Sequence, residues 1–330
     1  MKLFSKSSGD AQREGEATAS PSLSVQTLVC RGQNHEHKDF CHDFLIHHET
    51  DQFFVGAILD GSSGGVHSQF ASGLFGKVFN LLLRVKGHLD NIRGPREPRD
   101  TAKYLMHEFC ERLAVVQHEL GLANNELLST ILLAVYSKPL NKLYVVAFGD
   151  GYIHVNGQGI KLKNTRYGDT EVNGVLMKGE NKPDYIIEDV SSMMERYVEH
   201  YFSYVHPDDE AEHRDEYHRI TGDIWKIFNE WYLSKPSYEF TDVRDFSIAS
   251  DGIFTFQSGI VDVSDEAIEL LLNSTSELYG GKESIALQRK ANLLSFKKRG
   301  PEDTHPYKLS AFNQDDLSII RVIINDPIEA

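Results

Sequence analysis

Three Asp-Gly pairs each stand at the end of a short apolar run in this 330-residue chain. The pairs are Asp60-Gly61, Asp150-Gly151 and Asp251-Gly252, and they follow residues 53–59, 143–148 and 246–250. Each run predicts a buried β-strand, and the glycine permits a sharp turn or a close approach of the backbone. If these strand ends converge, their carboxylates could hold a hard divalent cation. A metal-dependent hydrolase is therefore the first hypothesis.

Further carboxylates extend this pattern. Asp43 lies early in the chain, and Asp315-Asp316 directly precede the apolar run 317–324. Two Mg²⁺ or Mn²⁺ ions about 3.5–4 Å apart can clamp a phosphoryl group and generate hydroxide near neutral pH. Such a site needs no covalent nucleophile. The simpler alternative is that each Asp-Gly pair is only a hairpin turn.

The elements that must position these acids alternate between short strands and amphipathic helices. Helical spacing marks residues 70–85, 100–120, 189–232 and 266–272, with Asp100 as a candidate N-cap and Gly121 as a candidate C′ residue. Strand patterns mark residues 22–29, 53–59, 129–136, 143–148, 152–155, 159–162, 246–250 and 317–324. This order predicts one mixed α+β domain over residues 21–330. Residues 1–20 are polar without periodicity and predict a disordered tail.

Composition narrows the classes of function. The net charge of −15 argues against a general binder of nucleic acid or of an anionic membrane surface. No apolar run has the length of a membrane span, and the N-terminus lacks a signal-peptide core. Three sparse cysteines favour a reducing cytoplasm over a disulfide framework. An acidic chain would repel a phosphoester, so a phosphatase needs a metal to reverse the local charge.

The ordered motifs resemble a family. Asp60-Gly61 after an apolar strand, Gly149-Asp150-Gly151, Ser250-Asp251-Gly252-Ile253 and Asp315-Asp316-Leu317-Ser318 follow the order and spacing of the PPM/PP2C metal-dependent protein phosphatases. Gly32-x-x-His35 and Cys41-His42-Asp43 are similar to the first acidic motif of that family's bacterial branch. The resemblance spans roughly residues 24 to 325. It implies a four-layer αββα sandwich, in which two central, mostly antiparallel β-sheets are flanked by helices.

The resemblance also implies the site and the reaction. Two Mg²⁺ or Mn²⁺ ions would be bound, and a bridging hydroxide would attack the phosphorus of phosphoserine or phosphothreonine in a protein substrate. The implied ligands are Asp43, Asp60, Gly61, Asp251 and Asp315, of which Asp60 and Asp251 are the predicted catalytic residues. Asp60 would bridge the ions, and Asp43 would hold waters of the second one. Asp150 matches a third metal site, and a variable helical flap is implied at about residues 165–242.

Three departures separate the chain from many members of that family. Ser62 stands where a general-acid histidine often follows the first Asp-Gly, and serine is a poor proton donor near neutral pH. Thr255 stands where a third-site aspartate is expected, so the third ion is not predicted with the first two. The phosphate-binding arginine is replaced by His35, with Lys38 as a further candidate. These departures motivate an alternative function, that of a pseudophosphatase that binds phosphoproteins without hydrolysis.

Other chemistries find less support. The histidines at 35, 37, 42, 47 and 48, with Cys30 and Cys41, lack the spacing of a structural zinc site. The glycine-rich loop 61–65 lacks the Lys-Ser/Thr ending of a P-loop, and its serines lack a Gly-x-Ser-x-Gly elbow. A phosphatase for small phosphoesters remains a further alternative.

Overall fold

The computed structural model describes residues 21–32, 41–62, 68–85, 89, 97–162, 170–172, 175–177, 185, 187, 196–198, 212–258, 261–262, 264–272 and 312–325. The tail expected at residues 1–20 lies outside these ranges, as do residues 165–169, 173–174, 178–184, 186, 188–195 and 199–211 of the flap expected at 165–242.

Two five-stranded antiparallel sheets form the centre of the molecule. The first sheet has the order β10-β5-β4-β3-β2, and the second has the order β1-β15-β11-β6-β7. The strands of the first sheet are β2 (Asp43–Glu49), β3 (Phe53–Gly61), β4 (Ser129–Ser137), β5 (Lys142–Phe148) and β10 (Ser237–Thr241). The strands of the second are β1 (Ser22–Cys30), β6 (Gly151–Val155), β7 (Gln158–Leu162), β11 (Asp245–Ala249) and β15 (Leu317–Asn325).

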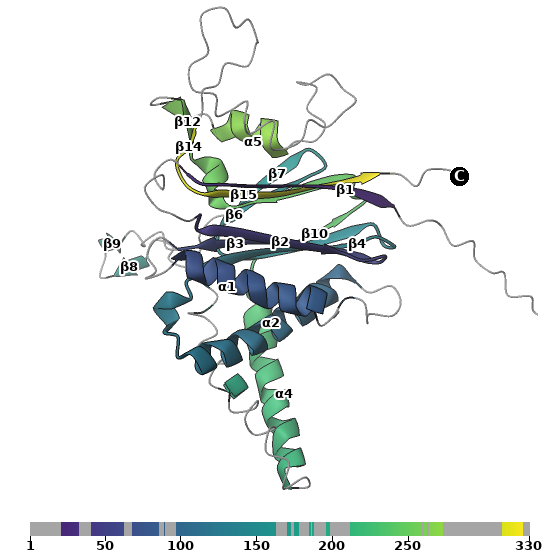
Figure 1. Ribbon diagram of the computed structural model, residues 1–330, viewed down its shortest axis with the longest axis vertical. Helices are drawn as coiled ribbons and strands as arrows, with labels where there is room; N and C mark the ends of the chain where they lie inside the picture. Colours follow the sequence, from purple (N-terminus) through teal and green to yellow (C-terminus); the bar gives the residue numbers. More distant parts are fainter. Residues whose placement is uncertain are drawn as a thin grey trace, which may run out of the picture.

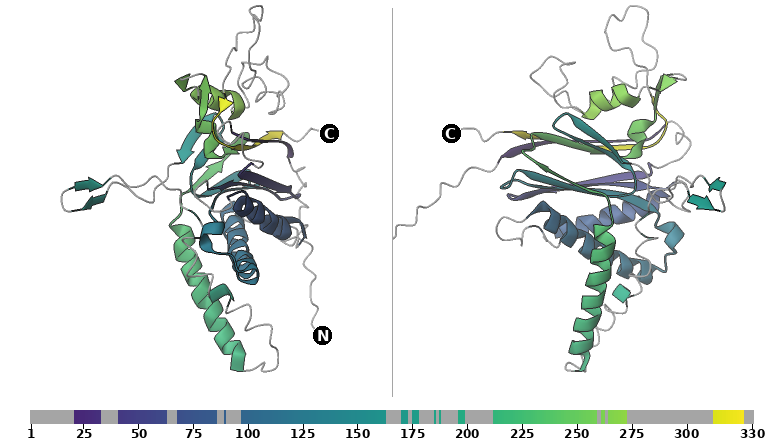
Figure 2. Two further views of the ribbon diagram at one scale, coloured as in Figure 1. Left: turned by 60° about the vertical axis from the view of Figure 1, so that its left-hand side comes forward. Right: turned by 180° about the vertical axis from the view of Figure 1, so that it is seen from behind.

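Helices cover the outer faces of the two sheets. The helices are α1 (Ser68–Asn80) with its π-helical extension η2 (Leu81–Val85), α2 (Pro98–Leu120), η3 (Asn124–Glu126), α4 (Glu212–Leu233), η4 (Asp251–Phe254) and α5 (Ser264–Leu272). Figure 1 shows the sheets face to face, with α1 and α2 beneath the first and α5 above the second. The predicted four-layer αββα sandwich is therefore confirmed. Figure 2 shows α4 extending beyond α1 and α2, away from the sheets.

Two small sheets complete the described elements. β12 (Phe256–Ser258), β13 (Val261–Asp262) and β14 (Phe312–Asn313) form one, and β8 (Thr170–Val172) pairs with β9 (Val175–Met177) in the other. Among the described residues, no helix has the length and apolarity needed to cross a membrane.

The central strands are apolar at almost every position because both of their faces are covered. In β3, Phe53 and Val55 belong to the core between the first sheet and the helices that cover it. Phe54 and Ile58 belong to the core between the two sheets. All four side chains are at most 2% exposed. The continuous apolar run therefore specifies a strand between two layers, and Asp60 is the first carboxylate after it, near the end of the strand.

The boundaries predicted at 70–85, 100–120 and 266–272 are close to those of α1 with η2, α2 and α5, whereas the helical pattern predicted at 189–232 is observed as α4 from Glu212, with 189–195 and 199–211 outside the described residues. α2 starts at Pro98 with Glu97 as its N-cap, three residues before the predicted helix start, because the fixed φ of proline suits the first helical turn. Asp100, the expected N-cap, lies instead in that first turn, where its charge complements the helix dipole. Gly121 adopts the left-handed conformation at φ 64°, as predicted for a C′ residue.

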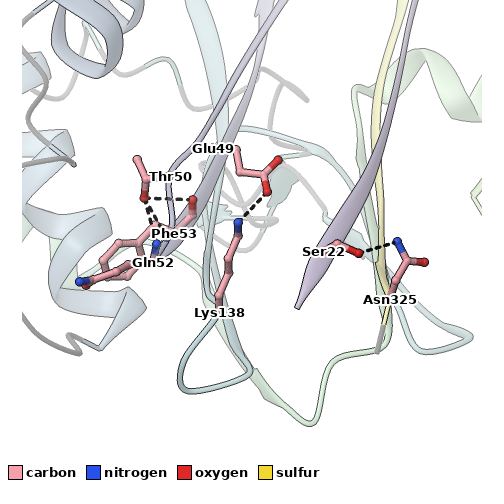
Figure 3. Close-up of polar contacts among 7 residues, drawn as sticks. All are labelled: Ser22, Glu49, Thr50, Gln52, Phe53, Lys138 and Asn325. Atoms are coloured by element: carbon pink, nitrogen blue, oxygen red, sulfur yellow. Dashed lines mark hydrogen bonds and ion pairs between the residues drawn. The ribbon is translucent and has the colours of Figure 1, made fainter. Parts of the chain in front are cut away.

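Polar contacts tie the strands together at one end of the sandwich (Figure 3). In the turn between β2 and β3, Thr50 Oγ1 accepts a hydrogen bond of 3.0 Å from the Phe53 amide. Lys138, after β4, forms an ion pair of 2.6 Å with Glu49 at the end of β2. Because β2 begins at Asp43 and ends at Glu49, this is the end of the first sheet opposite to the acidic residues.

Candidate metal centre

Five acidic residues lie at one end of the sandwich. Asp43 begins β2 and pairs in register with Asp60, near the end of β3. Asp150 joins β5 of the first sheet to β6 of the second. Asp251 follows β11, and Asp315 lies two residues before β15, which is antiparallel to β11. The end of one antiparallel strand lies beside the start of its neighbour. All five residues therefore lie at neighbouring strand ends.

The structure brings three of these carboxylates into one group. Oxygen atoms of Asp60, Asp150 and Asp251 lie within 4.8 Å of one another, although the residues are up to 191 positions apart in the sequence. The side chains of Asp43 and Asp60 share one face of the first sheet, because directly paired residues of antiparallel strands point the same way. Asp43 is 5% exposed. The acids of both sheets therefore face one small volume.

Burial and the repulsion of neighbouring carboxylates make Asp43, Asp60 and Asp251 hard to ionise. Burial raises the pKa of Asp251 to about 7, and the charges of Asp150 and Asp315 add to the effect. Burial likewise raises the pKa of Asp43 to about 7, against the hydrogen bond that Ser250 donates. Burial and then the charges of Asp43 and Asp251 hold the pKa of Asp60 well above its usual range. A positive ion among these oxygens would remove the repulsion.

The site has an oxygen without a protein donor. Asp43 Oδ1 is buried and has no hydrogen-bond partner among the described residues, whereas Asp43 Oδ2 accepts a hydrogen bond of 2.6 Å from Ser250 Oγ. Carboxylate oxygens are the donors that Mg²⁺ and Mn²⁺ prefer. The donor set and the buried oxygen thus fit the two divalent ions that the motifs imply.

Asp316 supports the backbone at the acidic end of the sandwich, a role that the motif analysis did not assign. It is 2% exposed, and its carboxylate accepts hydrogen bonds from the amides of Gly32, at 2.7 Å, and His42, at 2.6 Å. Asp316 therefore fixes the backbone on which Asp43 stands. The only sequence signal was the doubled acid Asp315-Asp316, in which one residue was expected to bind metal and the other was given no role.

Close backbone approach explains the glycine after Asp251. A Cβ atom on Gly252 would lie 1.9 Å from the Asp316 carbonyl oxygen. The η4 helix can therefore pack against the residues before β15 only with glycine at this position. Gly61, the glycine of the predicted ligand set, is buried and donates its amide to the His42 carbonyl oxygen at 3.1 Å.

Thr255 stands where the resemblance implies the aspartate of a third metal site. Its hydroxyl forms hydrogen bonds with backbone groups. Its hydroxyl donates to the Gly252 carbonyl oxygen at 2.7 Å and accepts from the amides of Gln314 and Asp315, each at 3.1 Å. Thr255 thereby holds the segment that carries Asp315 against η4.

Ser62, which replaces the general-acid histidine, is 8% exposed and accepts a hydrogen bond from the Tyr185 hydroxyl. This contact links the segment expected to vary to the residue that follows Asp60-Gly61. His35 and Lys38, the candidates for phosphate binding, lie outside the described residues.

A second group of potential ligands lies on α2. Donor atoms of His107, Glu108 and Glu111 approach within 4.8 Å of one another. Burial and the charge of Glu111 raise the pKa of Glu108, and the positive charge of Arg112 opposes that shift. Arg112 thus already supplies a cation beside this group. Within the described part of the chain, neither group of potential ligands contains a histidine or cysteine from residues 30–48.

Comparisons with known proteins give matches among solved structures only, because no family model and no curated protein matches the chain. The chain is similar to RsbX, solved in complex with magnesium, at 11% identity and a TM-score of 0.42, over 95% of this chain and 99% of that one. It is similar to the PP2C phosphatase domain of SpoIIE from Bacillus subtilis, solved with a fragment of its regulatory domain, at 13% identity and a TM-score of 0.46, over 94% and 66%. It is also similar to a bacterial serine phosphatase at 12% identity and a TM-score of 0.47, over 93% and 100%. At these identities and TM-scores the likeness carries no argument about the activity of this chain; the chain is similar to solved structures that include a PP2C phosphatase domain and a bacterial serine phosphatase.

Proposed function

We propose that this chain is a Mg²⁺- or Mn²⁺-dependent phosphatase that hydrolyses phosphoserine and phosphothreonine in proteins. The observation that carries the proposal is the approach of oxygens from Asp60, Asp150 and Asp251 to within 4.8 Å, in a site where burial raises the pKa of Asp60 and Asp251. Buried carboxylates that repel one another are costly unless a proton or a cation neutralises them. Two divalent ions would do so and would also reverse the sign of the site for a phosphate.

Each predicted ligand has a role in this proposal. Asp60 would hold both ions, and the Gly61 carbonyl would offer a further ligand. Asp251 and Asp315 would hold the first ion, and Asp43 would hold the second through water. Asp150, predicted for a third ion, would serve the same centre, since its oxygens lie with those of Asp60 and Asp251. When bound, such ions supply an acidified water as nucleophile and positive charge against the phosphoryl oxygens.

The protein's own contribution is to fix these acids and to keep the site away from bulk water. Asp43, Ser62 and Asp316 are each at most 8% exposed. The hydrogen bonds of Asp316 to two amides and of Thr255 to the segment before β15 set the backbone of the acids before any ion arrives. Preorganised groups of this kind need no rearrangement during the reaction, which is the main source of electrostatic stabilisation in enzymes.

The alternative is a phosphoprotein-binding pseudophosphatase. Two observations favour it: Ser62 accepts the Tyr185 hydroxyl where a histidine could have protonated the leaving group, and Thr255 is engaged with backbone groups. Such a protein would keep the acidic group and its ions but would release little phosphate. A cytoplasmic location and a phosphoprotein partner stay predictions for either function.

The test is phosphate release from a phosphothreonine peptide with Mn²⁺, with EDTA, and from the Asp251→Asn and Asp60→Asn variants with Mn²⁺. We expect release with Mn²⁺ only and a loss of at least about 100-fold in each variant, because each removes a charge that holds the ions. Binding of the phosphopeptide without release would favour the pseudophosphatase. Full activity in either variant would refute the assignment of the site.

A further inference from the structure

Ser250 is a buried serine that directly precedes Asp251, and its side chain makes two hydrogen bonds. It is 2% exposed. Its Oγ accepts from the Ser318 amide at 2.9 Å and donates to Asp43 Oδ2 at 2.6 Å. A serine hydroxyl has one proton to donate. The contact with the amide therefore leaves that proton for the Asp43 carboxylate.

The position of Ser250 in the second sheet explains this geometry. β11 and β15 pair in register up to Ala249 and Ile319, and the Ser250 amide continues the ladder to the Ser318 carbonyl oxygen at 3.0 Å. The return bond from the Ser318 amide goes to the serine side chain instead of to a backbone carbonyl. The ladder thus ends at Ser250, and the chain turns into η4 with Asp251 as its first residue.

The contact with Asp43 joins the two sheets beside the acidic group. Asp43 belongs to β2 of the first sheet, and Ser250 lies 207 residues later in the second. One side chain therefore couples the backbone next to Asp251 to the carboxylate of Asp43. Because Oδ2 is engaged by this bond, Oδ1 is the oxygen of Asp43 that stays available to an ion or to its waters.

We propose that Ser250 is a positioning residue for the metal centre: its hydroxyl holds the Asp43 carboxylate in the orientation that binds the second divalent ion. This inference rests on the proposed function only for the presence of the ions. It assigns Ser250 no contact with substrate. Residues that orient a metal ligand by a hydrogen bond commonly contribute 10- to 100-fold to metal affinity.

The experiment measures Mn²⁺ binding directly, by the loss of the electron paramagnetic resonance signal of free Mn²⁺ on titration into the full chain. We expect Ser250→Ala to raise the dissociation constant of the weaker Mn²⁺ site by about 10-fold or more. Ser250→Thr keeps a hydroxyl and should bind within about 3-fold of the wild type. Phosphate release by Ser250→Ala should need more Mn²⁺ and should recover at saturation, which is a change in metal requirement rather than in kcat.

The chain offers a matched control in Ser247 on β11, the strand that Ser250 follows. Ser247 is 0% exposed and donates to the Leu272 carbonyl oxygen at 3.1 Å, under α5 and away from the acids. Ser247→Ala should lower the free energy of unfolding, as Ser250→Ala does, because each removes a buried hydrogen bond. It should leave Mn²⁺ affinity unchanged. A purely structural role for Ser250 would make the two variants alike in both measurements.

Each outcome decides one question. Wild-type Mn²⁺ affinity in folded Ser250→Ala would overturn the inference, even if the chain is an active phosphatase. Weakened binding in Ser250→Ala, with no phosphate release from any variant, would support the inference and overturn the proposed function. If Ser250→Ala does not fold, Ser250→Cys takes its place, since a thiol is a weak donor of similar size. Wild-type affinity in that variant would equally overturn the inference.

Discussion

The substitution Asp251→Asn should make the metal-free protein more stable above neutral pH while it weakens metal binding. The pKa of Asp251 is raised from 3.8 to about 7, so the folded state keeps a proton in this interval that the unfolded state has lost. The free energy of unfolding therefore falls as pH rises from about 4 to about 7. At 1.36 kcal/mol per pKa unit the shift corresponds to about 4 kcal/mol. Asparagine has nearly the same shape and has no charge to bury.

At pH 8 in EDTA, the free energy of unfolding of Asp251→Asn should exceed that of the wild type by about 2 to 4 kcal/mol. The charges of Asp150, Asp315 and Asp43 contribute to the same shift, so their effects are not added separately. At pH 4 the two proteins should differ by less than about 1 kcal/mol, because Asp251 is then protonated in the folded wild type.

The assay is urea unfolding at pH 4 and pH 8, with EDTA and with Mn²⁺. A bound ion at 100 times its dissociation constant adds about 2.7 kcal/mol to the wild type, and the variant should gain less. The order of stability should therefore approach equality or reverse when Mn²⁺ is added. Asp223→Asn, at an exposed position on α4, is the control and should leave the free energy of unfolding and its response to Mn²⁺ unchanged. The reasoning is refuted if the Asp251→Asn variant is no more stable than the wild type at pH 8 in EDTA.

Two further predictions contrast the acidic end with the opposite end of the sandwich. Gly252→Ala should destabilise the fold by about 3 kcal/mol in urea unfolding, because the new methyl group would lie 1.9 Å from the Asp316 carbonyl oxygen. A loss below about 1 kcal/mol would show that η4 can move away from that carbonyl group. Lys138→Met should lower the free energy of unfolding by at most about 1 kcal/mol and leave phosphate release unchanged. Its ion-pair partner Glu49, at 2.6 Å, has a side chain that is 38% exposed and stays hydrated without the lysine. Any loss of activity in this variant would contradict the placement of the site at the far end.

Local patterns in the sequence predicted the strands, the helices and a mixed α+β domain, whereas the four layers were implied only by the resemblance to a family. The apolar run of β3 and the helical spacing along α2 are each decided by residues close together in the chain. The start of α2 was misplaced at Asp100 because proline at the first helical position competes with the aspartate signal. Boundaries of helices and strands depend on residues close together in the chain and can therefore be predicted from the sequence.

Much of the candidate site was likewise visible as acids at strand ends, but their distances were not. The approach of Asp60, Asp150 and Asp251 depends on the register of several strands and on the packing of two sheets, which no local pattern specifies. The roles of Ser250 and Asp316 could not be predicted at all. The contacts of Ser250 with Asp43 and of Asp316 with His42 join residues 207 and 274 positions apart.

What the sequence by itself determined is therefore which residues end each strand and which charges they carry. What only the tertiary structure decided is that these charges share one buried volume, where desolvation and repulsion raise the pKa values of Asp60 and Asp251. The physical reason is that a buried strand is specified by the run of apolar side chains along its own sequence. A site is specified by the antiparallel pairing and stacking that bring distant strand ends together.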